Sequence, residues 1–493
     1  MKRPHMLHPL VLAPLLTLLL AAPLLALWEP EVQISSDTTG TIMDQFAQQA
    51  HCALMQDNGV LRAVWFKYKS NGQHNIWTTI SSDNGTTWGP ETRLTYQTYE
   101  GAEDPAIAGS GPILHLLWMR GGGGVLYEIY YQRSTDYGAT WSPDTQFTNT
   151  SGHSTGNESP VVATSGSYVH VAWCGPLVPD GAVYMQYKRS TDMGATWGPN
   201  QVISTPTRLL GPNATIAAAD SNVYVAFAVN YGSGRHGIKY TRSSDNGTTW
   251  SPETVLVSTE AVTRDLFAQG SDLHLVYDDL STGYGITTYR RSTDCGVTWA
   301  PIIELASDTT GYEFNLQARV AASGSGVHVF WIFGDNNTPQ QPQLVYARSM
   351  DMGATWEPAL HLTHYSDTLL TRKSKPQIVI SGAAVHVFFS DSRPTTSHDH
   401  IWYMRNLTAN GVEEISGGRG PRVEVRLKTQ PNPFVAFATV PGHERERFAL
   451  YDVSGRKVGT YNGSRIGEGL RAGVYFLKAE GKDAKPVRIV KLR

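Results

Sequence analysis

Acidic, basic and tyrosine side chains in the segments between predicted strands are the first candidates for chemistry. We predict catalytic roles for Asp104, Glu158, Tyr312 and Glu313, and substrate-binding roles for Glu100, Arg264, Asp265, Arg319 and Arg372. Two carboxylates on either side of a sugar suit glycoside hydrolysis, whereas acids opposed to arginines suit a binding site for a polar glycan. The alternative is a set of solvated loop residues, whose ion pairs contribute little.

An eight-residue motif, Ser-x-Asp-x-Gly-x-Thr-Trp, occurs six times and shows which elements position these residues. Its aspartates lie 49 to 57 residues apart, at Asp83, Asp136, Asp192, Asp245, Asp294 and Asp351. In a turn, aspartate accepts backbone N–H groups, glycine takes a conformation that a β-carbon disfavours, and tryptophan packs against the strands. We therefore interpret the octet as a structural clasp on a hairpin rather than as a metal or ligand site.

Each repeat reads as four short strands, which is the size of one propeller blade. The second strand of the unit recurs seven times, and the last unit lacks a fourth strand. The stretch 28–35 resembles 88–95, which follows the first octet. The N-terminal strand can therefore complete the last blade and leave no open edge between the chain ends. We predict an all-β, seven-bladed β-propeller with six octets, with six blades as the alternative.

The two ends of the chain differ from its middle. Residues 1–26 have a basic start and an apolar run with small residues, which indicates a secretory signal peptide, with a membrane anchor as the alternative. Residues 27–414 form the propeller, 415–423 a Gly-rich linker and 424–493 a small C-terminal β-sandwich. Residues 27–421 carry 23 basic and 36 acidic side chains, so a nucleic-acid partner is not expected.

The octet resembles the Asp-box of the sialidase-like (BNR) propeller families, and the resemblance covers about residues 28–406. It implies a β-propeller and, in catalytic members, three arginines, a tyrosine nucleophile with a glutamate partner, and an aspartate acid/base. Gln49 stands where the first arginine would lie, and the loop 67–74 has no acid. The resemblance therefore leaves two hypotheses open, a glycosidase with altered chemistry and a non-catalytic binding or adhesion protein. A structural surface-layer component is a third.

The C-terminal segment resembles the type A sorting domain of type IX secretion cargo. The resemblance rests on Pro431–Phe434, Tyr451–Val458 and Ala472–Phe476 in combination. It implies passage through the outer membrane and a secreted or surface-attached protein without a lasting membrane span. The expected partners are an extracellular glycan or glycoprotein and, through 424–493, the type IX secretion machinery.

No cofactor or metal is expected, although a structural calcium ion in the central channel stays open. Histidines recur at one position of the second strands, at His115, His170, His274, His328 and His386. Because the position repeats, we expect these rings to pack within the blades rather than to bind metal.

Overall fold

A computed structural model describes most of the chain in separate stretches. These are residues 28–36, 51–56, 60–68, 74–96, 101–122, 124–149, 153, 155–176, 183–206, 208–232, 235–281, 283, 285–306, 313–335, 342–363, 374–392, 399–409, 447–452, 456–462, 464–471, 473–479 and 487–491. The predicted signal peptide 1–26 and linker 415–423 lie outside them. Within the described part of the chain, no helix is long and apolar enough to cross a membrane.

The chain divides into two compact units, Met1–Val412 and Glu413–Arg493. The described residues of the first unit form seven four-stranded antiparallel sheets. Sheets 1 to 3 are β2–β5 (His51–Gln56, Val60–Tyr68, His74–Ser81, Thr92–Arg93), β6–β9 (Gly101–Ser110, Ile113–Gly122, Val125–Ser134, Thr145–Gln146) and β10–β13 (Glu158–Ser165, Tyr168–Pro176, Val183–Ser190, Gln201–Val202). Sheets 4 and 5 are β14–β17 (Arg208–Ala219, Asn222–Gly232, Arg235–Ser243, Thr254–Val257) and β18–β21 (Ala261–Gln269, Asp272–Asp279, Ile286–Ser292, Ile303–Glu304). Sheet 6 is β22–β25 (Glu313–Ser323, Gly326–Asp335, Gln343–Ser349, Leu360–His361), and sheet 7 is β26, β27, β28 and β1 (Ser374–Ser381, Ala384–Ser392, Asp399–Asn406, Val32–Gln33).

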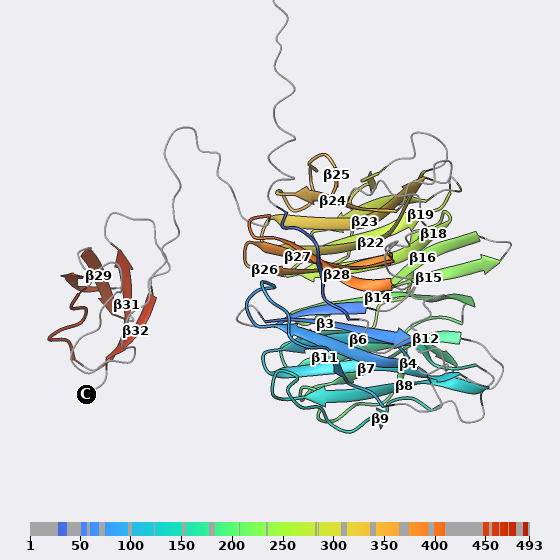
Figure 1. Ribbon diagram of the computed structural model, residues 1–493, viewed down its shortest axis with the longest axis horizontal. Helices are drawn as coiled ribbons and strands as arrows, with labels where there is room; N and C mark the ends of the chain where they lie inside the picture. The colour runs from blue at the N-terminus through green and yellow to red at the C-terminus, as the bar shows by residue number, and fades with distance from the viewer. Residues whose placement is uncertain are drawn as a thin grey trace, which may run out of the picture. The chain divides into compact units, whose positions relative to one another are not determined.

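The first strand of each sheet contacts the first strand of the next sheet. Strands β2, β6, β10, β14, β18, β22 and β26 follow one another in this way, and β26 contacts β2 again. The sheets therefore surround a common axis. Figure 1 shows the strands of this unit lying side by side. The expected all-β, propeller-type fold is confirmed.

The N-terminal strand β1 completes sheet 7, as the likeness between 28–35 and 88–95 predicted. Val32 and Gln33 pair with Tyr403 and Trp402 of β28, and Ser35 Oγ accepts the Ile401 N–H at 2.9 Å. The same serine-to-backbone bond occurs in sheet 3, where Ser204 Oγ accepts the Met185 N–H at 2.8 Å. This repetition shows that β1 takes the place of an ordinary fourth strand.

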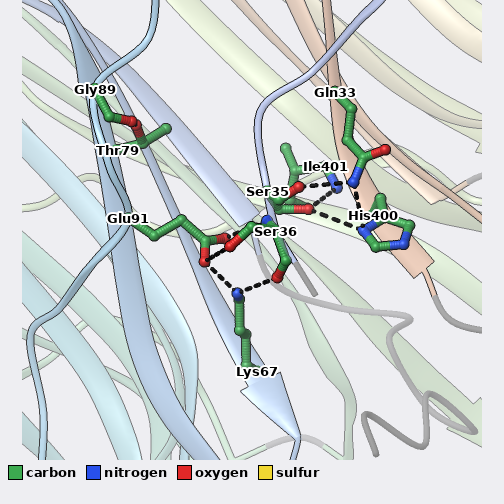
Figure 2. A network of polar contacts seen from close by, with 9 residues as sticks. All are labelled: Gln33, Ser35, Ser36, Lys67, Thr79, Gly89, Glu91, His400 and Ile401. Carbon is green, nitrogen blue, oxygen red and sulfur yellow. Dashed lines mark hydrogen bonds and ion pairs between the residues drawn. The ribbon is translucent and has the colours of Figure 1, made fainter. Parts of the chain in front are cut away.

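A polar network holds the segment after β1 to sheet 1 (Figure 2). Glu91 accepts the Ser36 N–H at 2.9 Å and the Ser36 hydroxyl at 2.8 Å. Lys67 donates to Glu91 at 2.5 Å and to the Ser36 carbonyl at 3.0 Å. Figure 2 also shows Gln33 and Ser35 against His400 of β28. The N-terminal segment thus joins sheet 7 to sheet 1, where the ring closes.

The octet aspartates accept hydrogen bonds from their own hairpins. Asp83 Oδ1 accepts the Thr87 N–H at 2.9 Å and the Ser81 hydroxyl at 2.7 Å, while Oδ2 accepts the Thr87 hydroxyl at 2.6 Å. These bonds lower the pKa of Asp83 to about 2, led by the Thr87 hydroxyl. The same bonds from the octet serine and last threonine recur at Asp136, Asp192, Asp245, Asp294 and Asp351.

The octets also join neighbouring sheets. In sheet 3, His170 Nδ1 lies 2.7 Å from Tyr187 Oη, and the Tyr187 ring packs edge-on against Trp250 of the next octet. A β-carbon on Gly247, whose φ is +75°, would lie 1.8 Å from Tyr187 Oη. The interface thus requires glycine for both conformation and space. As expected, the recurring histidines pack within the sheets, and burial lowers the pKa of His170 to about 4.

The second unit shows one four-stranded antiparallel sheet in its described residues. Its strand order is β30-β29-β31-β32, formed by Lys457–Asn462, Arg447–Asp452, Gly473–Ala479 and Val487–Lys491. We expected a small β-sandwich over 424–493, and residues 424–446 lie outside the described stretches.

Candidate functional site

The first strands of several sheets carry an irregularity near their N-terminal ends. The pairing register shifts between Glu103 and Ala106 in β6, and between Glu158 and Val161 in β10. Asp104 and Ser159 lie within these shifts with φ of +46° and +56°, in the left-handed region that non-glycine residues rarely adopt. Such bulges turn side chains away from the regular alternation of the strand. Glu103 and Glu158 therefore occupy equivalent positions in neighbouring sheets.

Side chains from sheets 1, 2 and 3 lie near the bulged starts of β6 and β10. We call His74, Glu103, Asp104, Tyr127 and Glu158 the acidic group. His74 begins β4, and its Nδ1 lies 2.6 Å from Glu103 Oε1. The two side chains are 14% and 24% exposed, so the contact is largely shielded from water. Burial raises the pKa of the Tyr127 hydroxyl, and the nearby charges of Glu103, Glu158 and Asp104 add to this effect.

Tyr127 is fixed by close backbone packing. Its carbonyl accepts the Asn157 N–H at 2.8 Å, which ties β8 to the residue before β10. A β-carbon on Gly156 would lie 2.7 Å from the Tyr127 nitrogen, and one on Gly121 would lie 2.8 Å from its Cα. Asn157 is itself held, because its Oδ1 accepts the Trp173 indole N–H at 2.9 Å. The phenol and Glu158 thus stand on neighbouring, rigidly joined strands.

The acidic group has the components of acid–base catalysis. Burial raises the pKa of Glu158, which favours a carboxyl group that retains its proton. Glu103 and Asp104 supply further carboxyl groups from the adjacent sheet, and His74 orients Glu103. A proton-donating carboxyl beside a second carboxylate is the arrangement used in glycoside hydrolysis.

A second polar cluster lies in sheets 5 and 6, and we call Arg264, Asp265, Asp278 and Arg319 the charged cluster. Arg264 Nε donates to Asp278, which is fully buried and also accepts the Gln317 N–H at 3.1 Å. Burial raises the pKa of Asp278, whereas the Arg264 guanidinium acts in the opposite direction. Asp278 therefore holds Arg264 within sheet 5 and joins this sheet to sheet 6 through the Gln317 N–H.

The other members of the charged cluster also bond within the protein. Arg319 donates to the carbonyls of Arg264 and Ala318 at 2.8 and 2.9 Å. Asp265 accepts the N–H groups of Leu266 and Val320, both at 3.0 Å. We expected Arg264, Asp265 and Arg319 to contact substrate, but the described bonds hold them to backbone and to a buried carboxylate. Their substrate-binding role stays a prediction.

The structure brings together two of the four predicted catalytic residues, Asp104 and Glu158, beside Tyr127. Glu100, Tyr312, Arg372 and the family-position residue Gln49 lie outside the described residues, and of Glu313 the backbone alone is described. The sequence analysis missed Tyr127, His74 and Asp278 as site residues. A signal existed for Asp278, an acid that directly follows the apolar run Leu275–Tyr277 of strand β19, whereas Tyr127 resembles other aromatic strand residues.

No group of three or more His, Cys, Asp or Glu side chains suited to a metal ion occurs among the residues described.

Comparison with known proteins gives a family and a fold. The model of the BNR repeat-like domain family matches residues 59–319. No curated protein matches the chain in sequence. A PL25 ulvan lyase, a polysaccharide lyase bound to -[GlcA(1-4)Rha3S]-, aligns with TM-score 0.50 at 11% identity and covers 74% of this chain and 94% of its own.

Two further solved structures are similar at lower TM-score. A protein of unknown function from Dyadobacter fermentans aligns with TM-score 0.45 at 15% identity and covers 76% of this chain and 97% of its own. NanB sialidase from Streptococcus pneumoniae aligns with TM-score 0.41 at 14% identity and covers 77% of this chain and 70% of its own.

Proposed function

The chain belongs to the BNR repeat-like domain family, and on that premise we propose that it acts on an extracellular glycan through the acidic group. The carrying observation is that Glu103 and Glu158 occupy equivalent bulges in two neighbouring sheets and that their charges, with that of Asp104, act on Tyr127. The ulvan lyase with a similar fold was solved bound to a glycan, so this fold accommodates a glycan in that protein. The reaction that suits the acidic group is glycoside hydrolysis.

In this proposal Glu158 is the proton donor to the glycosidic oxygen. Burial raises its pKa, which is the direction that a proton donor requires. Asp104 or Glu103 serves as the second carboxylate, which activates water or attacks the sugar. Tyr127 stays a neutral phenol, because burial and the surrounding acids disfavour phenolate, and it can donate a hydrogen bond to a sugar hydroxyl.

The charges favour a neutral sugar over a sialoside. Three carboxyl groups lie near enough to raise the pKa of the phenol, and negative charge on the sugar would be repelled by those that are ionised. The arginines that would hold a carboxylate, Arg264 and Arg319, have internal partners in the described structure. We therefore propose a neutral polysaccharide as the substrate class.

We also propose that the protein is exported. Residues 1–26 would direct it across the inner membrane, and 424–493 would direct passage through the outer membrane by the type IX machinery. The mature protein would then meet glycans or glycoproteins in the medium or at the cell surface. Expression with 424–493 deleted, in a host that has this machinery, tests the proposal: loss of the protein from the outside supports it, and undiminished export contradicts it.

The test of catalysis is turnover by the purified full chain. A panel of neutral polysaccharides and fluorogenic neutral glycosides is assayed beside a fluorogenic sialoside. We expect release of reducing ends from a neutral glycan, with a loss of at least about a hundredfold in Glu158→Gln. Asp136→Asn, in an octet of sheet 2, is the control and should retain turnover. Release from the sialoside alone would contradict the neutral-substrate assignment.

A non-catalytic binding protein is the second candidate. It is favoured by Gln49 at the position of the family's first arginine and by the internal partners of Arg264 and Arg319. Saturable binding of a neutral glycan without any turnover would support this function over hydrolysis.

A further inference from the structure

We propose that Glu128, acting through Asn157, is a positioning residue for the proton donor Glu158, an inference that rests on the proposed function. Glu128 follows Tyr127 in β8, and Asn157 directly precedes β10, which begins at Glu158. Asn157 Nδ2 donates to Glu128 Oε2 at 3.0 Å, and the Asn157 N–H donates to the Tyr127 carbonyl at 2.8 Å. Two hydrogen bonds therefore connect the chain beside the phenol to the chain beside the proton donor.

Both partners of this contact are anchored. Glu128 Oε2 also accepts the Thr148 hydroxyl at 2.6 Å, and the same hydroxyl oxygen accepts the Ile129 N–H at 2.9 Å. Asn157 is 4% exposed, and its Oδ1 accepts the Trp173 indole N–H at 2.9 Å. The buried asparagine is thus held through its backbone N–H and both ends of its side-chain amide, which fixes the residue before the proton donor.

Sheets 5 and 6 repeat the backbone part of this arrangement. The Asn315 N–H donates to the Gly285 carbonyl at 3.0 Å, and Asn315 Oδ1 accepts the Trp331 indole N–H at 2.9 Å. A register shift again follows, directly after Leu316. Asn315 is therefore the counterpart of Asn157, and a leucine takes the place of the proton donor.

The repeat separates residues of the general frame from residues of the site. Gly285 stands where sheet 2 has Tyr127. The next residue, Ile286, stands where sheet 2 has Glu128. A β-carbon on Gly285 would lie 2.3 Å from Leu316 Cδ2, so an apolar side chain fills this position. The asparagine–tryptophan bond thus recurs beside glycine, isoleucine and leucine, whereas the carboxylate that accepts the asparagine amide accompanies the phenol and the proton donor. This pattern assigns Glu128 to the site.

Fixing the asparagine matters because proton donation depends on distance. A general acid has to lie within hydrogen-bond reach of the leaving oxygen, and a displacement of ~1 Å can cost up to about a hundredfold in rate. Without the Glu128 acceptor, the Asn157 amide loses one of its three anchors, and the start of β10 can shift. Since neither residue touches the sugar in this proposal, the loss should appear in kcat and leave KM nearly unchanged.

The first experiment measures kcat and KM of the full chain on the neutral glycoside of the panel that the wild type turns over fastest. Glu128→Ile, which copies sheet 5, should lower kcat about tenfold and change KM less than twofold. Glu128→Gln should keep kcat within twofold, because the bonds from Thr148 and Asn157 both end on Oε2, which an amide oxygen can replace.

The matched pair is Asn157→Ser and Asn315→Ser. Each variant removes the acceptor of a buried indole N–H, in sheet 3 or in sheet 6, so the two should lower the Tm by similar amounts. Only Asn157→Ser should lower kcat, again about tenfold. If Glu128→Ile does not fold, this pair decides alone.

Equal kcat values in Asn157→Ser and Asn315→Ser would overturn the positioning role. A loss in Glu128→Gln as large as in Glu128→Ile would overturn it as well, because the hydrogen bonds would then not carry the effect. Both results leave the proposed function intact, since the wild type is active in them. A wild type that turns over no neutral glycan would refute the proposed function and the positioning role with it.

Discussion

Replacement of Trp28 by alanine should open the ring where the N-terminal strand closes it. Trp28 is 9% exposed and packs edge-on against Phe330 and Tyr346, with ring centroids 5.6 and 5.1 Å away. It takes the place that octet tryptophans have elsewhere, such as Trp250 against Tyr187 at 4.8 Å. Unlike the strands that follow an octet, β1 has no hairpin linking it to its neighbour β28. Its attachment depends on side-chain packing and a few hydrogen bonds.

The magnitude follows from the buried area. A tryptophan side chain buries about 150–250 Å², which at ~25 cal/mol per Å² corresponds to roughly 4–6 kcal/mol as an upper estimate. Trp→Ala substitutions in cores typically lose about 3–5 kcal/mol, so we expect about 4 kcal/mol for Trp28→Ala. With an unfolding entropy near 0.8 kcal/mol/K for a unit of roughly 390 residues, the Tm should fall by about 5 °C.

Calorimetry and hydrogen exchange with mass spectrometry provide the assay. In Trp28→Ala, amide exchange in β28 should accelerate, because loss of β1 exposes that strand as an edge. Trp250→Ala is the control: it should lower the Tm but leave exchange in β28 unchanged. An unaltered Tm together with unaltered exchange in β28 would refute the idea that the N-terminal strand closes the ring.

Three further predictions follow from individual contacts. Gly247→Ala should lower the free energy of unfolding by about 2–4 kcal/mol, because the new β-carbon meets the Tyr187 hydroxyl at a positive φ; a melt that matches the wild type contradicts this. Burial lowers the pKa of His274 to about 4, so stability should be present above pH ~6.5 and be lost as the pH falls towards 4, with a shallower loss in His274→Gln by thermal melts; equal slopes would be the contrary result. Arg264→Met should lower stability by about 3–5 kcal/mol, because it leaves Asp278 buried and unpaired, and should leave glycan affinity unchanged by titration; reduced affinity in the folded variant would restore Arg264 to the substrate site.

Local turn chemistry made much of the fold predictable. The conformation of the octet is determined locally, because Asp83, Gly85 and Thr87 form hydrogen bonds within a few residues of one another. The closing strand was also predictable, because residues 28–35 repeat the pattern of a segment whose place in the sheet was already inferred. In both cases the interacting groups lie in one short segment or recur in each repeat.

The candidate site was less predictable because its contacts come from different sheets. Asp104 and Glu158 stood out as acids at strand entries, but nothing near Tyr127 in the sequence shows that its ring meets them. The register shifts at Asp104 and Ser159 turn side chains out of the regular alternation of their strands, and no motif marks these bulges in the sequence. The pairing of Arg264 with Asp278 was missed although both lie on paired strands of sheet 5, because no motif marks a buried ion pair in the sequence. Arg264, Asp265 and Arg319, all predicted to contact substrate, have partners within the protein.

The third strand of a sheet connects the octet, which stabilises the fold, to the opposite end of the sheet, where the candidate site lies. Strand β8 runs from Val125 to Ser134. Tyr127 of the acidic group lies near its start, and Ser134, which begins the octet of sheet 2, lies at its end. The two residues are roughly 23 Å apart at ~3.3 Å per residue. The octets hold neighbouring sheets together at one end through glycine, tyrosine and tryptophan contacts. Residues at the bulged starts of the first strands lie at the other end, so substitutions there can leave those contacts intact. Retention of the octets is therefore evidence for the fold alone, and the proposed activity has to be tested at the residues of the acidic group.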